Sequence, residues 1–177
     1  MTWKILDVGC GESKAPDAIG IDLRPSKGVD VVGDLARFPW PFRPNTFDVI
    51  LFNDSLEHME DVVAAMREAH RMAKPGGRVK ILTPHFSHPD AFRDPTHRHY
   101  FTYQTIDYFT GAMPHLQYGG MLFKLIERKF VFTKGQQLSR WVATHVHHKK
   151  YERYLSRIFP AEKLYFELEA VKGPDRR

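Results

Sequence analysis

The sequence contains a single cysteine, Cys10, among 177 residues, and no hydrophobic run approaches the length of a membrane-spanning helix. One cysteine excludes an intrachain disulfide and is typical of a reducing compartment. A helix across a bilayer needs about 18 or more apolar residues, so we expect no transmembrane segment. The first residues, MTWKILDVGC, enter a strand pattern directly and do not resemble a signal peptide. These absences predict a cytoplasmic protein.

Positive and negative charges balance each other outside one segment of the chain. The chain carries a net charge of +5, and the whole of this excess lies between Thr133 and Ile158. That segment has one acidic residue, Glu152, and six basic residues: Lys134, Arg140, Lys149, Lys150, Arg153 and Arg157. A local positive charge attracts an anionic substrate. Because Trp141 and Tyr154 are interleaved with the cations, a solvated helix face, a membrane surface and single-stranded RNA remain alternative interpretations, although no recognised RNA-binding motif accompanies them.

The pattern of apolar residues predicts alternating strands and helices. Apolar residues at three- and four-residue spacing predict a helix that begins near Asp61 and ends before Lys74–Gly77, and they predict further helical segments in Tyr103–Met113 and Gln136–Ile158. Short apolar runs predict seven strands: Trp3–Val8, Ala18–Asp22, Val29–Gly33, Phe47–Phe52, Arg78–Thr83, Phe123–Phe132 and Leu164–Val171. This order predicts one α/β domain over residues 1–177, with a mostly parallel sheet.

A glycine turn follows the first predicted strand, and an aspartate ends the second. In parallel α/β sheets, ligands bind outside the carboxyl ends of the strands, beside the point where the strand order reverses. Gly9 and Gly11 allow the backbone to approach a ligand closely. Asp22 is placed to accept hydrogen bonds from two ribose hydroxyls. These residues predict a nucleoside site.

Two further residues indicate which nucleoside binds. A dinucleotide-binding turn has a third glycine at the position where this sequence has Lys14. Asp7, just before the turn, would repel a pyrophosphate but suits an ammonium group. A ligand with adenosine at one end and an amino acid at the other satisfies Asp7 and Asp22 together. These two acids therefore indicate S-adenosylmethionine.

Five segments resemble motifs of class I S-adenosylmethionine-dependent methyltransferases of the small type 11 group. They are LDVGCG, IGIDL, VGDL, PWPFRPNTFDVILFNDSLEHMED and RMAKPGGRVKILTP, and together they cover Trp3–Thr83 in the family's order and spacing. The resemblance implies S-adenosylmethionine as the cofactor, with Asp34 on the adenine amino group. It also implies this set of cofactor-binding residues: Asp7, Gly9, Cys10, Gly11, Asp22, Leu23, Gly33, Asp34, Leu35, Asn53 and Leu56.

The resemblance also implies a fold. It predicts a Rossmann-like, doubly wound, mostly parallel sheet of seven strands in the order 3-2-1-4-5-7-6, with strand 7 antiparallel. This sequence departs from the family in its first two connections, because only ESKAPDA and RPSKG separate the first three strands. A crossover helix needs about a dozen residues. We therefore expect the first two crossover helices to be shortened or missing.

The sequence says less about the methyl acceptor and its binding site than about the cofactor. Methyl transfer needs an aligned acceptor and a base if the acceptor carries a proton, and we expect His58 and His97 to be catalytic. The acceptor is predicted to be a small or anionic molecule bound by two late segments, Pro84–Phe101 and Gln136–Ile158. The alternative function is a non-catalytic, cofactor-binding domain that acts as a partner or regulator. The sequence specifies no oligomeric state.

A metal site is a further alternative. The pattern Asp54-x-x-Glu57-His58 followed by a later histidine resembles the Glu-x-x-Glu-His…His metal site of small-RNA 2′-O-methyltransferases and ubiquinone O-methyltransferases. Such ligands hold Mg²⁺ or Zn²⁺ and polarise a hydroxyl. The aspartate is shorter than the glutamate it replaces, and Glu57 and His58 also suit the start of a helix. We therefore predict no metal.

Overall fold

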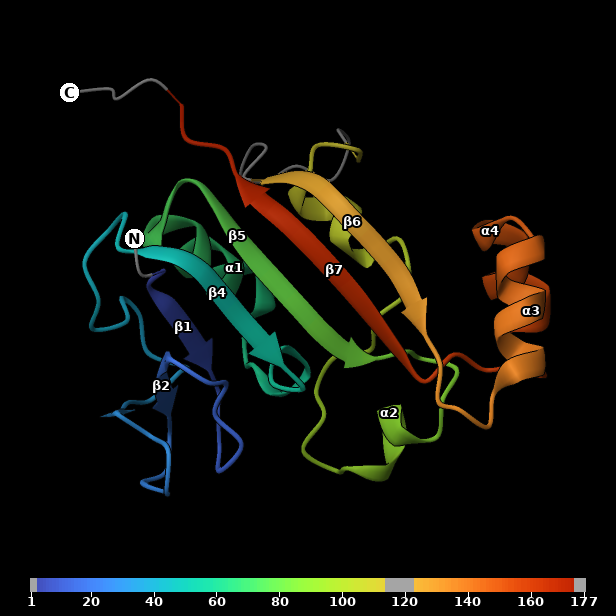
Figure 1. Ribbon diagram of the computed structural model, residues 1–177, viewed down its shortest axis with the longest axis horizontal. Helices are drawn as coiled ribbons and strands as arrows, with labels where there is room; N and C mark the ends of the chain where they lie inside the picture. The colour runs from blue at the N-terminus through green and yellow to red at the C-terminus, as the bar shows by residue number, and fades with distance from the viewer. Residues whose placement is uncertain (1–2, 114–122, 174–177) are drawn as a thin grey trace.

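The computed structural model describes residues 3–113 and 123–173, and these form one seven-stranded sheet with helices at its far side and at one end (Figure 1). The strand order is β3-β2-β1-β4-β5-β7-β6, as predicted. The strands are β1 (Ile5–Val8), β2 (Ala18–Asp22), β3 (Val31–Val32), β4 (Phe47–Asn53), β5 (Ala73–Pro84), β6 (Phe123–Val131) and β7 (Lys163–Ala170).

The direction of each strand also agrees with the prediction. β1 pairs in parallel with β2 and β4, and β4 pairs in parallel with β5. β7 lies between β5 and β6 and is antiparallel to both. The carboxyl ends of β1, β2, β4 and β5 therefore meet at one edge of the sheet, which is where ligands bind in this architecture.

Short loops replace the first two crossover helices, as the sequence predicts. Residues 9–17 join β1 to β2, and residues 23–30 join β2 to β3, in both cases without a helix. The loops pack directly onto the sheet at Gly20 of β2. A Cβ atom at Gly20 would lie 2.6 Å from Cys10 Sγ and 2.8 Å from the carbonyl oxygen of Gly28. The loops therefore cover the sheet here with both side-chain and backbone atoms, at a distance that admits only glycine.

Helix α1 (Val62–Met72) is the long helix that the sequence predicts between β4 and β5. Its first turn is capped by the Asp61 side chain, which accepts a hydrogen bond from the Ala64 backbone N–H at 2.9 Å. Its apolar face is buried against the sheet through Ala65, Met66, Ala69 and Met72. The chain leaves the helix in an extended conformation at Ala73, which already pairs with Phe47, so β5 begins earlier than predicted.

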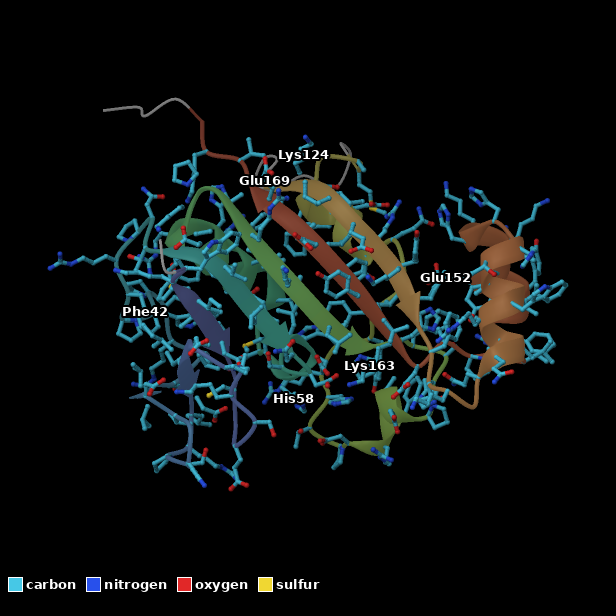
Figure 2. All side chains as sticks on the ribbon, viewed as in Figure 1. Phe42, His58, Lys124, Glu152, Lys163 and Glu169 are labelled. Atoms are coloured by element: carbon cyan, nitrogen blue, oxygen red, sulfur yellow. The ribbon has the colours of Figure 1, made fainter. Side chains whose placement is uncertain are left out.

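The two faces of the sheet differ in composition. Along β7, Leu164, Phe166, Leu168 and Ala170 are buried on the α1 side, and the residues between them face outward. The outward face carries cross-strand ion pairs, including Arg78 with Glu169 at 3.1 Å, and Lys124 pairs in register with Glu169 (Figure 2). Among the described residues, no helix covers this charged face of β5, β7 and β6 in Figure 1.

The C-terminal helical segment is interrupted, whereas the sequence predicted one helical stretch over Gln136–Ile158. It consists of α3 (Gln137–His145), α4 (His148–Lys150) and the π-helical turn η4 (Tyr151–Leu155). Val146 adopts an extended conformation, and the His147 side chain accepts a hydrogen bond from the Lys149 backbone N–H, which starts a new turn. The segment has its own small core around Val142, Ala143 and Tyr151.

Three shorter helical turns complete the described fold. They are η1 (Leu56–His58) after β4, α2 (Asp90–Arg93) after β5, and η2 (Thr105–Phe109), which lies within the helical segment predicted over Tyr103–Met113. The first two of these turns lie at the carboxyl edge of the sheet, beside the ends of β4 and β5 (Figure 1). No described helix is both long enough and apolar enough to cross a membrane.

Candidate functional site

The glycine turn after β1 is held tightly against the end of β4. Gly9 has a φ of +68°, and a Cβ atom there would lie 2.7 Å from the Cβ of Ser55. The Ser55 hydroxyl donates to the carbonyl oxygen of Val8 at 2.6 Å, and the Gly9 N–H donates to Ile21 O at 2.8 Å. The turn is therefore fixed between the ends of β2 and β4 before any ligand binds.

Two carboxylates face the site from neighbouring strand ends. Asp22, at the end of β2, accepts hydrogen bonds from the backbone N–H groups of Gly11 at 2.9 Å and Arg24 at 3.2 Å. Asp34, just after β3, accepts from the Ala36 N–H at 3.0 Å and pairs with Arg37 at 3.1 Å. Each oxygen keeps a second lone pair. Both carboxylates are thus oriented by the protein and retain acceptor capacity for a ligand.

A cavity of about 440 Å³ lies beside these carboxylates. This volume falls in the range of roughly 300–1,000 Å³ that is typical of small-molecule sites. Of the predicted cofactor-binding residues, Gly9, Asp22, Leu23, Asp34 and Leu35 line the cavity. The other lining residues are Ala36, Asp54, Ser55, His58, Met59, Glu60 and Arg98. Paired carboxylates with apolar side chains between them fit a ribose and a purine, so the residues present fit the nucleoside part of S-adenosylmethionine.

The remaining predicted cofactor residues lie around the cavity without lining it. Leu56 is fully buried in the core, and Cys10 is buried beneath the turn. Gly11 hydrogen-bonds to Asp22, Gly33 donates its N–H to the Asp22 carbonyl oxygen, and Asn53 is exposed at the end of β4. Their roles in cofactor binding stay predictions.

Asp7 does not line this cavity, and its contact with the ligand stays a prediction. It is 1% exposed, and its Oδ2 accepts a hydrogen bond from the Ala15 backbone N–H at 2.8 Å, which holds the loop between β1 and β2. Its Oδ1 is buried without a partner among the described residues. Burial raises the pKa of this carboxyl group, and the hydrogen bond from Ala15 partly offsets that rise.

A second cavity, of about 490 Å³, adjoins the first along the carboxyl edge of the sheet. Asp54 and His58 line both cavities. The other residues that line the second cavity are Glu57, Pro84, Asp90, Arg93, Asp94, Pro95, His97 and Lys163. The segment Pro84–Phe101, which the sequence predicted as part of the acceptor site, contributes six of the ten lining residues. His58 and Lys163 lie at this edge in Figure 2.

The two predicted catalytic histidines lie together in this second cavity. The ring centroids of His58 and His97 are 4.6 Å apart, with an interplanar angle of 69°. Glu57 is beside them and is 1% exposed. Burial lowers the pKa of His58, as does neighbouring His97, and burial raises the pKa of Glu57. The structure thus brings together two imidazoles and one buried carboxyl group.

The basic segment is placed away from both cavities, contrary to our expectation. Among the described residues, none from 136–158 lines either cavity. α3 and α4 lie beyond β6, at the opposite end of the molecule from β1 and β2 (Figure 1). The basic segment is linked to the second cavity only indirectly. Its Glu152 accepts a hydrogen bond from His85, which is next to the cavity residue Pro84. The segment therefore does not close over either of these two cavities, and its contact with an acceptor stays a prediction.

Sequence reasoning missed several residues that line the cofactor cavity. Arg98 reaches it from the loop after β5, because its backbone N–H donates to the Glu57 carbonyl oxygen at 2.9 Å. Met59 and Glu60 reach it from the turn after η1. Met59 and Glu60 could have been predicted, because both lie inside the motif PWPFRPNTFDVILFNDSLEHMED. No local pattern marked Arg98.

Comparisons with known proteins agree with this geometry. Residues 6–81 match the family model of the methyltransferase domain. A ubiquinone biosynthesis O-methyltransferase from Aliivibrio fischeri is 33% identical over 101 residues, which cover 45% of this chain and 43% of the relative. A demethylmenaquinone methyltransferase from Streptomyces griseus is 34% identical over 103 residues, covering 49% of this chain and 44% of the relative. The chain thus spans less than half the length of these curated relatives.

The fold is also that of solved methyltransferases. A structure described as a SAM-dependent methyltransferase from Archaeoglobus fulgidus superposes with a TM-score of 0.65 at 17% identity, covering 94% of this chain and 86% of that one. The strand order is that of an α/β fold with a glycine turn after β1, and the match to the methyltransferase domain covers the first five strands of this sheet. Residues 6–81 are thus similar to the methyltransferase domain, and the described chain has the fold of solved S-adenosylmethionine-dependent methyltransferases.

Proposed function

We propose that the chain transfers a methyl group from S-adenosylmethionine to a small molecule bound in the second cavity. The observation that carries this proposal is that the two cavities adjoin and that Asp54 and His58 line both. A methyl donor in one cavity and an acceptor in the other would meet beside these two side chains. Two relatives, a ubiquinone biosynthesis O-methyltransferase and a demethylmenaquinone methyltransferase, support methyl transfer to a small molecule.

The residues of the first cavity bind and orient the cofactor. With the cofactor bound, Asp22 would accept hydrogen bonds from the ribose hydroxyls, Asp34 would accept from the adenine amino group, and Leu23 and Leu35 would pack against the purine. When bound, S-adenosylmethionine supplies a methyl group whose bond to the sulfonium breaks as the acceptor lone pair bonds to carbon, the sulfur keeping the electron pair. The fixed glycine turn at Gly9 sets the position of this ligand relative to the acceptor cavity.

The residues of the second cavity handle the acceptor and its proton. His58 and His97 are the imidazoles of the cavity, and they activate an acceptor that must lose a proton as it is methylated. The charge of the lining argues against an anionic acceptor. It contains four carboxyl groups, from Asp54, Glu57, Asp90 and Asp94, against two cations, from Arg93 and Lys163. A neutral or cationic acceptor fits this cavity better than the anion considered from the sequence.

A labelled-transfer screen tests the proposal. The full chain would be incubated with methyl-labelled S-adenosylmethionine and panels of phenols, catechols, enols and amines, with labelled product and S-adenosylhomocysteine both quantified. We expect transfer to at least one panel, lost in His58→Ala and kept in Lys134→Ala, a matched change in the distant basic segment. Cofactor binding by calorimetry with no transfer to any acceptor would instead favour the non-catalytic, cofactor-binding alternative.

A further inference from the structure

The starting observation is a buried carboxylate oxygen that lacks a partner. Glu57 is 1% exposed, and its Oε2 accepts a hydrogen bond from the Thr83 hydroxyl at 3.0 Å. Its Oε1 is buried and has no hydrogen-bond partner among the residues that the structure describes. An unsatisfied buried acceptor costs about 1–3 kcal/mol, and more if it is charged. Because Glu57 also lines the acceptor cavity, this oxygen is available to a ligand there.

The hydrogen bonds of His97 fix which of its nitrogens is free. Its Nδ1 lies 2.9 Å from the carbonyl oxygen of Ala91. A carbonyl oxygen can only accept, so Nδ1 must carry the hydrogen. In the neutral imidazole, Nε2 therefore holds the lone pair. His97 thus offers one nitrogen lone pair to the cavity that it lines.

The same reasoning applies to His58 through a hydroxyl group. The Thr96 hydroxyl lies 2.7 Å from the Asp94 carboxylate and 2.9 Å from His58 Nδ1. A carboxylate can only accept, so the single hydroxyl hydrogen of Thr96 goes to Asp94, and Thr96 Oγ1 accepts from His58 Nδ1–H. Nε2 of His58 is then the atom with the lone pair. Neutral His58 and His97 therefore share one tautomer.

The three free atoms belong to residues that lie close together. Glu57, His58 and His97 each offer a ligand atom, and these atoms lie within 4.8 Å of one another. Around a zinc ion with bonds of about 2.0–2.2 Å, ligand atoms lie roughly 3–3.5 Å apart, so small side-chain rotations close the site. Each of the three also has its other polar atom held by a hydrogen bond, the arrangement that orients metal ligands. The excess of carboxyl groups in the cavity favours a cation.

We propose that Glu57, His58 and His97 bind one divalent transition-metal ion of the zinc class. Two imidazoles and one carboxylate are the ligand set of open catalytic metal sites, which leave further positions for a substrate. Mg²⁺ is disfavoured because it prefers oxygen ligands. Asp54, the first residue of the pattern noted in the sequence, is not a ligand, because its carboxylate pairs with Lys163. The prediction of no metal is replaced by this proposal.

The metal site specifies the kind of acceptor, and this step rests on the proposed function. The ion lies in the wall of the acceptor cavity, so its open positions are filled by an oxygen of the acceptor. A divalent ion lowers the pKa of a bound hydroxyl, which then loses its proton to solvent before methyl transfer. His58 and His97 thus act through the ion rather than as free bases. The acceptor is a molecule with a phenol, catechol or enol oxygen.

Metal binding can be measured without any activity. The tag-free full chain would be titrated with Zn²⁺ in competition with a chromogenic chelator, and its bound metal counted by mass spectrometry after dialysis. We expect one ion per chain. Glu57→Gln and His97→Ala should each weaken binding at least about tenfold, whereas His88→Gln, a histidine of the same loop outside the three, should bind like the wild type. Thermal melts would verify that each variant is folded.

A substitution at a residue that does not bind the metal distinguishes a metal site that the protein orients from adventitious metal binding. Thr96→Val keeps the shape of the side chain but removes the oxygen that accepts from His58 Nδ1–H. It should weaken Zn²⁺ binding about tenfold and alter the visible spectrum of the Co²⁺-loaded chain. Wild-type affinity in Glu57→Gln and His97→Ala, or binding of no metal by the wild type, would overturn the proposal.

An activity measurement distinguishes the two proposals from each other. Chelation should abolish labelled-methyl transfer to phenol, catechol or enol acceptors, and Zn²⁺ or Mn²⁺ should restore it. Full transfer in metal-free chain would refute the metal site and leave the methyltransferase proposal intact. Stoichiometric metal binding without transfer to any acceptor would support the site and refute the proposed function.

Discussion

Nε2 of His85 lies 3.0 Å from a carboxylate oxygen of Glu152, and this pair joins the end of β5 to the C-terminal helical segment. His85 is fully buried. Its Nδ1 accepts a hydrogen bond from the Ser87 backbone N–H, so its Nε2 carries the hydrogen and donates to Glu152. The same carboxylate oxygen accepts from the Tyr103 N–H at 2.6 Å. One side chain therefore satisfies two donors from separate parts of the chain.

Removal of this carboxylate should destabilise the fold. Glu152→Ala leaves the donors of His85 and Tyr103 without a partner, and we expect the free energy of unfolding to fall by about 2–4 kcal/mol. Glu152→Gln keeps an acceptor oxygen, so it should lower the free energy of unfolding by less than Glu152→Ala does. Glu127→Ala, which breaks an exposed ion pair with Lys129, is the control and should stay within about 0.5 kcal/mol. Urea unfolding followed by circular dichroism measures all three, and equal losses in Glu152→Ala and Glu127→Ala would contradict the assignment.

Cofactor affinity should depend on the carboxylate at the end of β2. Asp22→Ala removes the acceptor for the ribose hydroxyls and also the acceptor for Gly11, so we expect S-adenosylhomocysteine binding to weaken by about 1.5–3 kcal/mol. Asp30→Ala is the matched control, because Asp30 accepts from Gly20 but lies outside the cavity. Calorimetry with both variants gives the comparison. A larger loss in Asp30→Ala than in Asp22→Ala would show that only loop order, and not ribose contact, controls affinity.

The close packing at Gly20 should make it intolerant of substitution. In Gly20→Ala, the new methyl group would lie 2.8 Å from the Gly28 carbonyl oxygen, which is backbone and cannot rotate away. We expect a loss of about 1–3 kcal/mol in the free energy of unfolding. Gly135→Ala has no heavy atom within 4 Å of its added Cβ and should change stability little. Chemical denaturation of both variants measures the difference, and a neutral Gly20→Ala would mean that the loop moves away freely.

Stability at acidic pH should depend on His70. Its Nε2 donates to the Val171 carbonyl oxygen at 2.8 Å, and burial lowers its pKa from the ordinary value of 6.5. Because the unfolded chain binds this proton more readily, the contribution of His70 to stability is constant well above pH 6.5 and falls as the pH drops through and below that value. The loss is at most about 1.4 kcal/mol per pH unit.

A variant that does not titrate isolates this effect. His70→Gln keeps an N–H donor for Val171 but binds no proton. The free energy of unfolding of the wild type, relative to the variant, should therefore decrease between about pH 7.5 and about pH 5.5. Urea titrations at several pH values measure it. Parallel curves for the two proteins would show that His70 has the same pKa in the folded and unfolded chains.

The sheet could be predicted from the sequence because its signals are local. The apolar runs of β1, β2 and β4 and the glycine turn at Gly9 lie within short motifs, and the lengths of residues 9–17 and 23–30 exclude helices. The start of β5 was misplaced, because Ala73 becomes extended through pairing with Phe47, a contact distant in sequence. The break at Val146 was missed for a related reason: apolar spacing continues on both sides of it.

The candidate site was predictable only where its residues follow strand ends. Asp22 and Asp34 were found because the end of each strand is marked in the sequence. The position of His97 beside His58 depends on the path of a loop, and its partner atoms in Ala91 and Thr96 have no sequence signature. Net charge was misleading for the same reason. The basic residues of α4 and η4 are concentrated in sequence but lie beyond β6, away from both cavities.

The short loops of the N-terminal half also affect how the chain folds. A strand–helix–strand unit has about 30 residues, whereas the paired residues Ile5 and Ala18 are about 13 positions apart. Loop-closure entropy scales with the logarithm of length, so bringing β1 and β2 together costs about 0.7 kcal/mol less than in a full crossover. We therefore expect β1 and β2 to pair early and the distant pairing of β5 with β7 to form late. Pulsed hydrogen exchange during refolding would show amide protection appearing in this order.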